Sequence, residues 1–230
     1  MKNTKNKKYI LFTSTDFGGG VSRIIRLLSS NLNKESNIKI FSLNEKKNKY
    51  LEENYEKVLI KKFSSFHIAR SYSVSWPLLS YLFKENPDIV HSHHYGYFPA
   101  TAGFIMAKLK RKPFIISTYL HPPSKNLFFR SLFYLQYFTQ GYFTIKFADV
   151  VVVSTQMEKD LIKKLFGKCK KIVVIPNPID TNTFKKTKTK RTDNKKIVLY
   201  VGLLSWVKGA DIFFDIAKRI LKKRNDVKFV

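Results

Sequence analysis

The sequence predicts an α/β protein whose first domain is a doubly wound, Rossmann-like parallel sheet. Strand-like and helix-like segments alternate along the whole chain. The strand-like segments are nearly unbroken runs of valine and isoleucine, such as DVVVVST at 149–155 and KIVVIP at 171–176. Strands of this composition are typical of parallel sheets that helices bury on both faces. Their alternation with helices favours the doubly wound arrangement.

The elements of this domain can be assigned in order. The first strand is expected at 9–14 (YILFTS), and the helix after it repeats apolar residues at helical spacing from Val21 to Leu32. Further strands are expected at 38–43, 57–62, 87–94, 113–118, 149–155 and 171–176. Further helices are expected at 75–86, 98–110, 126–147 and 156–166.

The domain organisation follows from a change in composition. The first domain is expected to span 1–180, and residues 181–195 are polar and strongly basic, as in an interdomain linker. A strand–turn–helix pattern then restarts, so 196–230 predict the start of a second Rossmann-like domain. So short a unit buries too little surface to close a core. We therefore expect a truncated form or a fragment of a longer protein.

Composition narrows the class of protein. One cysteine, Cys169, excludes a disulfide scaffold and any multi-cysteine metal site. The N-terminal apolar run at 9–12 is too short for a signal peptide, and no uncharged run reaches membrane-spanning length. These features predict a cytoplasmic protein. The net charge of +27 attracts nucleic acid, anionic lipid or phosphorylated molecules. A lysine-rich, solvated surface accounts for the charge equally well.

A glycine turn follows the first predicted strand. Gly18, Gly19 and Gly20 allow backbone amides to approach a ligand at the positive end of a helix. Their spacing matches neither the P-loop nor the G-x-G-x-x-G fingerprint. The alternative is a plain strand-to-helix turn that requires positive φ.

Three histidines end the predicted strand at 87–94. Period-two alternation places His91 and His93 on one face and His94 on the other, without neighbouring carboxylates, so no metal site is expected. Ligands bind at the carboxyl ends of strands in open α/β sheets. His94 and Tyr95 are therefore candidates for substrate contact, with a packing role as the alternative.

Six segments, in order, resemble the retaining glycosyltransferases of family 4, which have two Rossmann-like domains facing across a cleft (the GT-B architecture). The segments are FGGGVSRIIRLLSSNL, PDIVHSHHYGYFPA, KPFIISTYLHP, ADVVVVSTQMEKDLI, VVIPNPIDTNTF and LYVGLLSWVKGAD. The resemblance implies transfer of a hexosyl group, with retention, from a nucleotide-diphosphate sugar to a glycan or lipid-linked acceptor hydroxyl. It implies no cofactor or metal besides the nucleotide sugar.

The resemblance also implies roles for residues of the first domain. Gly18, Gly19 and Gly20 would line the cleft near donor phosphate and acceptor. Relatives carry a histidine that contacts the sugar or acceptor, and some show T-x-H-x-H-P. His121 matches the second histidine of this pattern, and Tyr119 stands where the first would be. His121 is therefore the preferred catalytic residue and Tyr119 the alternative.

In the second domain the family pattern is G-R-L…K-G. Gly202 permits the sharp turn, and Lys208 near the next helix would neutralise a leaving diphosphate. The alternative is a solvated lysine at a helix start. Leu203 replaces the arginine, which should weaken leaving-group stabilisation. The acidic E-x7-E element that contacts the donor in relatives would lie beyond residue 230, so activity of the 230 residues alone is in doubt.

The segment 126–147 contains six phenylalanines and three tyrosines. A core helix explains them, and so does docking on an anionic membrane surface, which suits aromatic side chains beside lysines. Peripheral membrane attachment is therefore expected as a further property. Two other functions stay open: a nucleic-acid-binding protein, and a non-catalytic remnant that binds membranes. Nucleic acid is the less favoured partner, because the basic residues are scattered and no binding module is recognised.

Overall fold

The chain is described by a computed structural model, in which it forms two compact units, Met1–Asp180 and Thr181–Val230. The described residues are 7–15, 19–44, 50–69, 72–120, 127, 131, 134–135, 137–184, 195–204 and 208–230.

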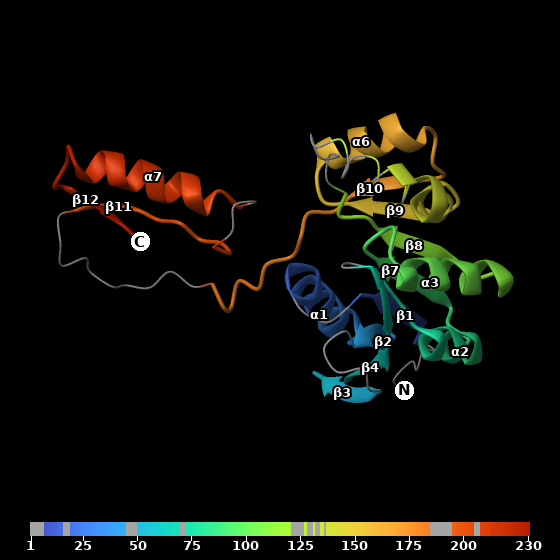
Figure 1. The fold of residues 1–230 in the computed structure, drawn as a ribbon. Helices are drawn as coiled ribbons and strands as arrows, with labels where there is room; N and C mark the ends of the chain where they lie inside the picture. The colour runs from blue at the N-terminus through green and yellow to red at the C-terminus, as the bar shows by residue number, and fades with distance from the viewer. Residues whose placement is uncertain are drawn as a thin grey trace. The chain divides into compact units, whose positions relative to one another are not determined.

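An eight-stranded sheet organises the described part of the first unit, in the order β10-β9-β8-β7-β1-β2-β4-β3 (Figure 1). Its strands are β1 (Tyr9–Ser14), β2 (Asn37–Asn44), β3 (Leu51–Tyr55), β4 (Val58–Ser64), β7 (Ile89–His93), β8 (Phe114–Ser117), β9 (Val150–Val153) and β10 (Ile172–Val174). Neighbouring strands are parallel, except that the edge strand β3 runs antiparallel to β4. The predicted α/β class with a Rossmann-like parallel sheet is confirmed.

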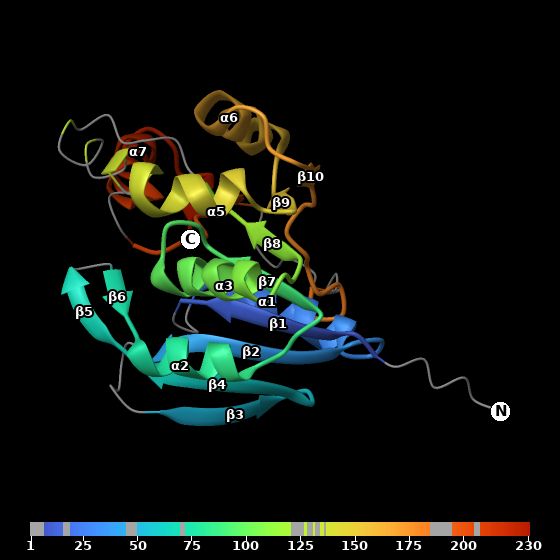
Figure 2. The same cartoon turned by 90° about the vertical axis from the view of Figure 1, so that its right-hand side faces the viewer.

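Helices lie on both faces of this sheet (Figure 2). α1 (Gly20–Leu32) packs on one face, and the other face carries α2 (Trp76–Lys84), α3 (Phe98–Leu109), α5 (Tyr142–Lys146) and α6 (Gln156–Phe166). The period of two along each strand separates two cores. Leu11 of β1 belongs to the larger core under α2 and α3, whereas Phe12 packs in the smaller core with Ile25 of α1.

Two helices begin with side-chain caps that the sequence encodes locally. Ser75 Oγ accepts a hydrogen bond from Leu78 N at 3.2 Å, and Pro77 occupies the first turn of α2. At α6, Thr155 Oγ1 accepts from Glu158 N at 3.1 Å. Each cap satisfies an amide that the helix leaves without an internal partner.

Some elements differ from the predicted ones. The hairpin of β5 (Phe66–Ala69) and β6 (Tyr72–Val74) and the edge strand β3 were not predicted. Within the predicted helix at 126–147, the structure has a π-helical turn at Tyr137–Gly141 followed by α5. Residues 126, 128–130, 132–133 and 136 of that helix lie outside the described part.

The prediction that the strands are buried on both faces was wrong for part of the sheet. On the face that carries α1, Ile115, Val152 and Val173 are half-buried and line a cavity. Their neighbours Ile116 and Val151 point to the other face and are fully buried. Ile24, Leu28 and Leu32 of α1 line the opposite wall of this cavity.

The second unit is a small β–α–β motif. Strands β11 (Lys196–Val198) and β12 (Val227–Phe229) are parallel, and α7 (Ala210–Leu221) connects them. Its buried apolar residues, among those described, are Ala210, Ala217 and Val227. In the described parts of both units, no helix is both long and apolar enough to cross a membrane.

Candidate functional site

Two residues at the carboxyl edge of the sheet have left-handed backbone. His94 directly follows β7 and has φ 73°, and Tyr119 lies two residues after β8 with φ 51°. A side chain with a Cβ is disfavoured in this region, and such residues gather at ligand-binding sites. The backbone N of His94 donates to Ser117 O at 2.9 Å, so the two strand ends are joined.

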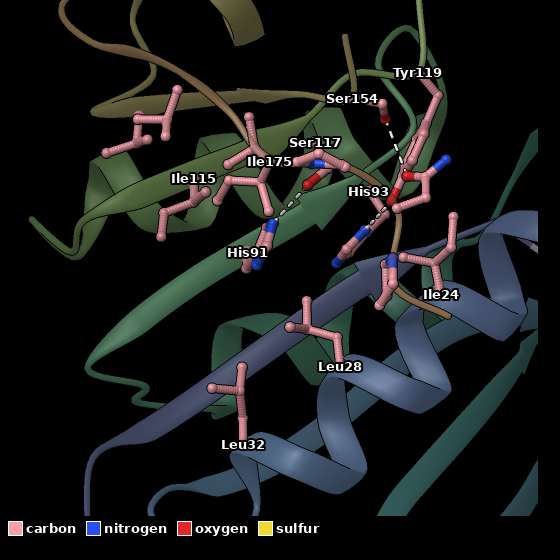
Figure 3. Close-up of a pocket in the computed structure, with 16 residues that line it drawn as sticks. Ile24, Leu28, Leu32, His91, His93, Ile115, Ser117, Tyr119, Ser154 and Ile175 are labelled. Atoms are coloured by element: carbon pink, nitrogen blue, oxygen red, sulfur yellow. Dashed lines mark hydrogen bonds between the residues drawn. The ribbon is translucent and has the colours of Figure 1, made fainter. Parts of the chain in front are cut away.

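Aromatic and imidazole rings form a cluster at this edge (Figure 3). The rings of His91 and His93 stack with centroids 4.3 Å apart. His93 Nδ1 lies 3.2 Å from the Tyr119 hydroxyl, within hydrogen-bond distance. The His94 ring lies edge-on to Tyr119 at 6.1 Å and near Tyr97 at 4.6 Å. The carboxyl ends of the neighbouring strands β7 and β8 thus bring these side chains close together.

A cavity of about 270 Å³ extends from this cluster along the sheet beside α1. Aliphatic side chains form most of its wall, and Figure 3 shows them between α1 and the sheet: Ile24, Leu28, Leu32, Ile115 and Ile175. Polar groups line the remainder. His91 Nε2 lies 2.9 Å from Ser117 Oγ, and Ser154 Oγ donates to Asn177 Oδ1 at 3.0 Å.

Burial sets the protonation of this cluster. Desolvation lowers the pKa of His91 to about 4. Desolvation, with smaller contributions from His91 and His94, holds the pKa of His93 well below its ordinary value. Burial raises the pKa of Tyr119 to about 12; the charge of Glu158 adds to this rise and a hydrogen bond with Ser117 opposes it. Near neutral pH, both imidazoles are uncharged and the phenol keeps its proton.

The chemistry available here is neutral hydrogen bonding. A neutral imidazole has one donor and one acceptor, and a phenol can act as either. His93 Nε2 is buried and has no hydrogen-bond partner in the described part of the chain. Such groups suit the hydroxyls of an uncharged ligand better than phosphates, which prefer cationic or backbone N–H donors.

The glycine turn is partly described. Gly19 caps α1 with φ 88° and ψ −166°, a conformation that essentially only glycine adopts. Gly20 is the first residue of α1, and a Cβ there would meet open space. The structure thus requires glycine at position 19 and places both residues at the carboxyl edge of β1. Gly18 lies outside the described residues.

The other predicted residues of the first unit differ in their surroundings. Tyr95 is only 8% exposed and belongs to the larger core, where burial raises the pKa of its phenol. Its place is therefore that of a packing residue, whereas His94 and Tyr119 belong to the edge cluster. His121, the preferred catalytic candidate, lies outside the described residues.

The predicted donor-side residues lie in the second unit. Gly202 is exposed, and the Tyr200 hydroxyl donates to Leu203 O at 2.7 Å across the turn. Lys208 is exposed and lies two residues before α7, whose N-cap Gly209 has φ 72°. In the described residues there is no group of three or more His, Cys, Asp or Glu side chains arranged to hold a metal ion.

The sequence analysis did not identify Glu158 as part of this edge. Its carboxylate accepts hydrogen bonds from Thr118 Oγ1 and Leu120 N, both at 2.6 Å. The T-x-x-E spacing of Thr155 and Glu158 is a local sign of a capping box. No local pattern indicates its contacts some forty residues earlier in the chain.

Comparison with known proteins bears on the first unit. The sequence model described as Glycosyltransferase Family 4 matches residues 18–183. No curated protein matches the sequence.

Solved structures share the fold at low identity. A glycosyltransferase from Rickettsia africae is 16% identical with a TM-score of 0.63, and the match covers 98% of this chain and 68% of that one. A structure described as trehalose-6-phosphate from E. coli bound with UDP-2-fluoro glucose is 13% identical with a TM-score of 0.59, covering 96% and 63%. Sucrose-phosphate synthase from Thermosynechococcus elongatus is 11% identical with a TM-score of 0.57, covering 97% and 70%. The chain spans less than two thirds of the E. coli protein and about two thirds of the others.

Proposed function

The chain belongs to glycosyltransferase family 4, and from this membership we propose that it transfers a hexosyl group from a nucleotide-diphosphate sugar to an acceptor hydroxyl with retention. The observation that carries the proposal is the family match, which spans the unit where His93, His94 and Tyr119 meet at the carboxyl edge of the sheet. The acceptor would be a glycan or a lipid-linked sugar.

We assign the neutral residues of the first unit to the sugar and the cationic Lys208 of the second unit to the donor diphosphate. The neutral cluster of the first unit, with His94 and Tyr119, would hydrogen-bond sugar hydroxyls, and Gly19 and Gly20 would line the cleft. His121 would contact the sugar at the reacting centre. In the second unit, Lys208 beside the first turn of α7 would hold the donor diphosphate after the turn at Gly202. No metal is needed in this scheme, because an ammonium and helix amides can balance the phosphate charge.

Donor binding is tested by titrating the protein with UDP-glucose and GDP-mannose in a calorimeter. We expect Lys208→Ala to weaken the affinity about 10- to 100-fold, as expected for losing a hydrogen bond between charged groups. Lys222→Ala is the matched control, because Lys222 is an exposed lysine at the other end of α7. If neither donor binds, or if both variants lose the same affinity, the proposed donor role is wrong.

Transfer itself is tested by nucleoside diphosphate release with an added acceptor. Retention predicts a product whose anomeric configuration, read from proton coupling constants, equals that of the donor. Addition of EDTA should leave the rate unchanged. A product of inverted configuration, or a rate abolished by EDTA and restored by Mg²⁺, would contradict the mechanism.

A peripheral membrane role is the second candidate, and exposed aromatic side chains favour it. Phe138, Phe143 and Phe147 are each more than half exposed, and Phe143 and Phe147 stack at 6.2 Å on either side of Lys146 in sequence. Aromatic rings beside lysines on a chain of net charge +27 suit an anionic bilayer surface.

Co-sedimentation with vesicles tests this role. We expect binding to vesicles containing phosphatidylglycerol, little binding to pure phosphatidylcholine, and a several-fold loss in the double variant Phe143→Ser/Phe147→Ser. Leu51→Ser is the control, because Leu51 is exposed on the far edge strand β3. Equal sedimentation with both vesicles would contradict it. Salt-dependent RNA binding without any nucleotide-sugar binding would instead favour a nucleic-acid-binding protein.

A further inference from the structure

Glu158 is a buried carboxylate that joins the ends of two neighbouring strands. Glu158 is 6% exposed and lies in the first turn of α6. One oxygen, Oε2, accepts from Ser154 N at 2.7 Å, just after β9. The other, Oε1, accepts from Thr118 Oγ1 and Leu120 N, just after β8.

These contacts exceed what helix capping requires. In a capping box, the acidic residue three positions into the helix reaches back to the amide of its own N-cap residue. Glu158 completes one half of the box through its backbone, which donates to Thr155 Oγ1. Its carboxylate instead bonds two segments outside the helix. Burying an ion is costly unless hydrogen bonds and fields compensate it, and here three donors and the helix N-terminus do so.

The segment that Glu158 holds contains a strained residue. Tyr119 lies between Thr118 and Leu120, the two residues that Oε1 anchors, and has φ 51°. A tyrosine leaves the left-handed region unless its surroundings impose it. Anchoring both neighbours fixes the direction of its side chain. That direction brings the hydroxyl to His93 and the ring to His94.

We propose that Glu158 is a positioning residue, whose carboxylate holds Tyr119 in the conformation that the acceptor-side site requires. This role rests on the proposed glycosyl transfer. The carboxylate is needed rather than a side chain of the same size, because all three of its partners are donors. A glutamine amide would turn its NH₂ toward either Ser154 N or the pair at Thr118 and Leu120, and would break one side of the link.

The test compares Glu158→Gln with Asp160→Asn, the matched control. Asp160 is an exposed carboxylate in the same helix, whose described contact is with Gln156 at 3.0 Å. Both variants lose one negative charge near the start of α6, and only the first breaks the link between strands. Thr118→Val removes one donor and keeps the carboxylate, so it reports on the link even if Glu158→Gln fails to fold.

The first readout needs no activity. With 3-fluorotyrosine incorporated, we expect the ¹⁹F signal of Tyr119, assigned by its loss in Tyr119→Phe, to shift in Glu158→Gln and less in Thr118→Val. Hydrogen exchange of the Leu120 amide should quicken at least tenfold in Glu158→Gln. Asp160→Asn should change neither. An unmoved Tyr119 signal and an unchanged Leu120 exchange rate in the folded variants would overturn the proposal.

The second readout separates this role from the proposed function. In a transfer assay, Glu158→Gln should raise the acceptor KM about tenfold and leave the donor KM unchanged. Equal changes in both constants would overturn the positioning role. A wild-type protein without transfer activity, but with the expected ¹⁹F and exchange changes, would contradict glycosyl transfer while supporting the link between Glu158 and Tyr119.

Discussion

His91 and His93 are buried side by side on β7, and burial keeps both neutral. The folded pKa of His91 is about 4, below its ordinary 6.5, so the unfolded chain binds a proton more readily than the folded one. The contribution of neutral His91 to the free energy of unfolding is therefore fully present above pH 6.5. It is lost as the pH falls from 6.5 toward 4. The pKa of His93 is also lowered by burial, so the protein also loses stability on this account as the pH falls.

We predict that His91 alone lowers the free energy of unfolding by about 3 kcal/mol between pH 7 and pH 4. His91→Gln should flatten this dependence, measured by urea unfolding at several pH values. His67→Gln, at an exposed histidine of β5, should leave the curve unchanged. A His91→Gln curve as steep as that of the wild type would show that burial does not set its pKa.

The two described glycines of the turn after β1 should respond differently to alanine. At Gly19, alanine must adopt φ 88° and ψ −166°, which costs about 1–3 kcal/mol. At Gly20, the backbone is helical and a Cβ meets open space, so alanine should stabilise by up to about 1 kcal/mol. Chemical denaturation of both variants checks this, and destabilisation of equal size would contradict it.

For single residues, the sequence predicts those features that depend on neighbours close by in the chain. Alternation placed His91 and His93 on one face, where both line the cavity, and the glycine run marked the turn at Gly19. The left-handed Tyr119 and the carboxylate that holds it were not predictable. Their hydrogen bonds join residues 38 and 40 apart in sequence, and no short pattern records such a pair.

At the scale of elements, the packing of α3 on β1 and β7 depends on one glycine. A Cβ at Gly103 would lie 2.7 Å from Ser92 Oγ and 3.0 Å from Thr13 Oγ1. Those two hydroxyls are buried and hydrogen-bonded to each other at 2.6 Å, so they cannot easily move aside.

Gly103→Ala should therefore destabilise the protein by about 1–3 kcal/mol, through overpacking. Alanine in place of a helical glycine ordinarily stabilises by about 0.5–1 kcal/mol, so the sign of the change is decisive. Thermal unfolding measures it. A higher Tm in Gly103→Ala would show that the hydroxyl pair yields to the added methyl group.

The predicted elements were those with strong apolar patterns, and the missed ones have little pattern of their own. Strand β3 (LEENY) is polar, and pairing with β4 supports it through two cross-strand salt bridges, Glu52 with Lys61 and Glu53 with Lys62. Charged side chains on an edge strand also discourage pairing with other chains. Such a strand depends on its neighbour, which sequence periodicity does not show.

For the whole molecule, the two units differ in how much they bury. The first contains two apolar cores with many fully buried side chains, whereas the described part of the second buries Ala210, Ala217 and Val227. We predict that amides of β11, α7 and β12 exchange at least a hundredfold faster than those of β1 and β7, because local stability follows buried apolar contacts. Hydrogen exchange followed by mass spectrometry checks this. Equal protection in both units would contradict it.

The strand order has a consequence for synthesis on the ribosome. Among the strands of this sheet, β1 comes earliest in the sequence; it lies inside the sheet, and β2 and β4 add to one side of it. Later, β7 joins the free side of β1 in the register Ile10 to Ile89, and β8, β9 and β10 follow in the order of translation. Each of these strands emerges when its neighbour has already been made. The sheet can therefore grow outward while the chain is still being synthesised.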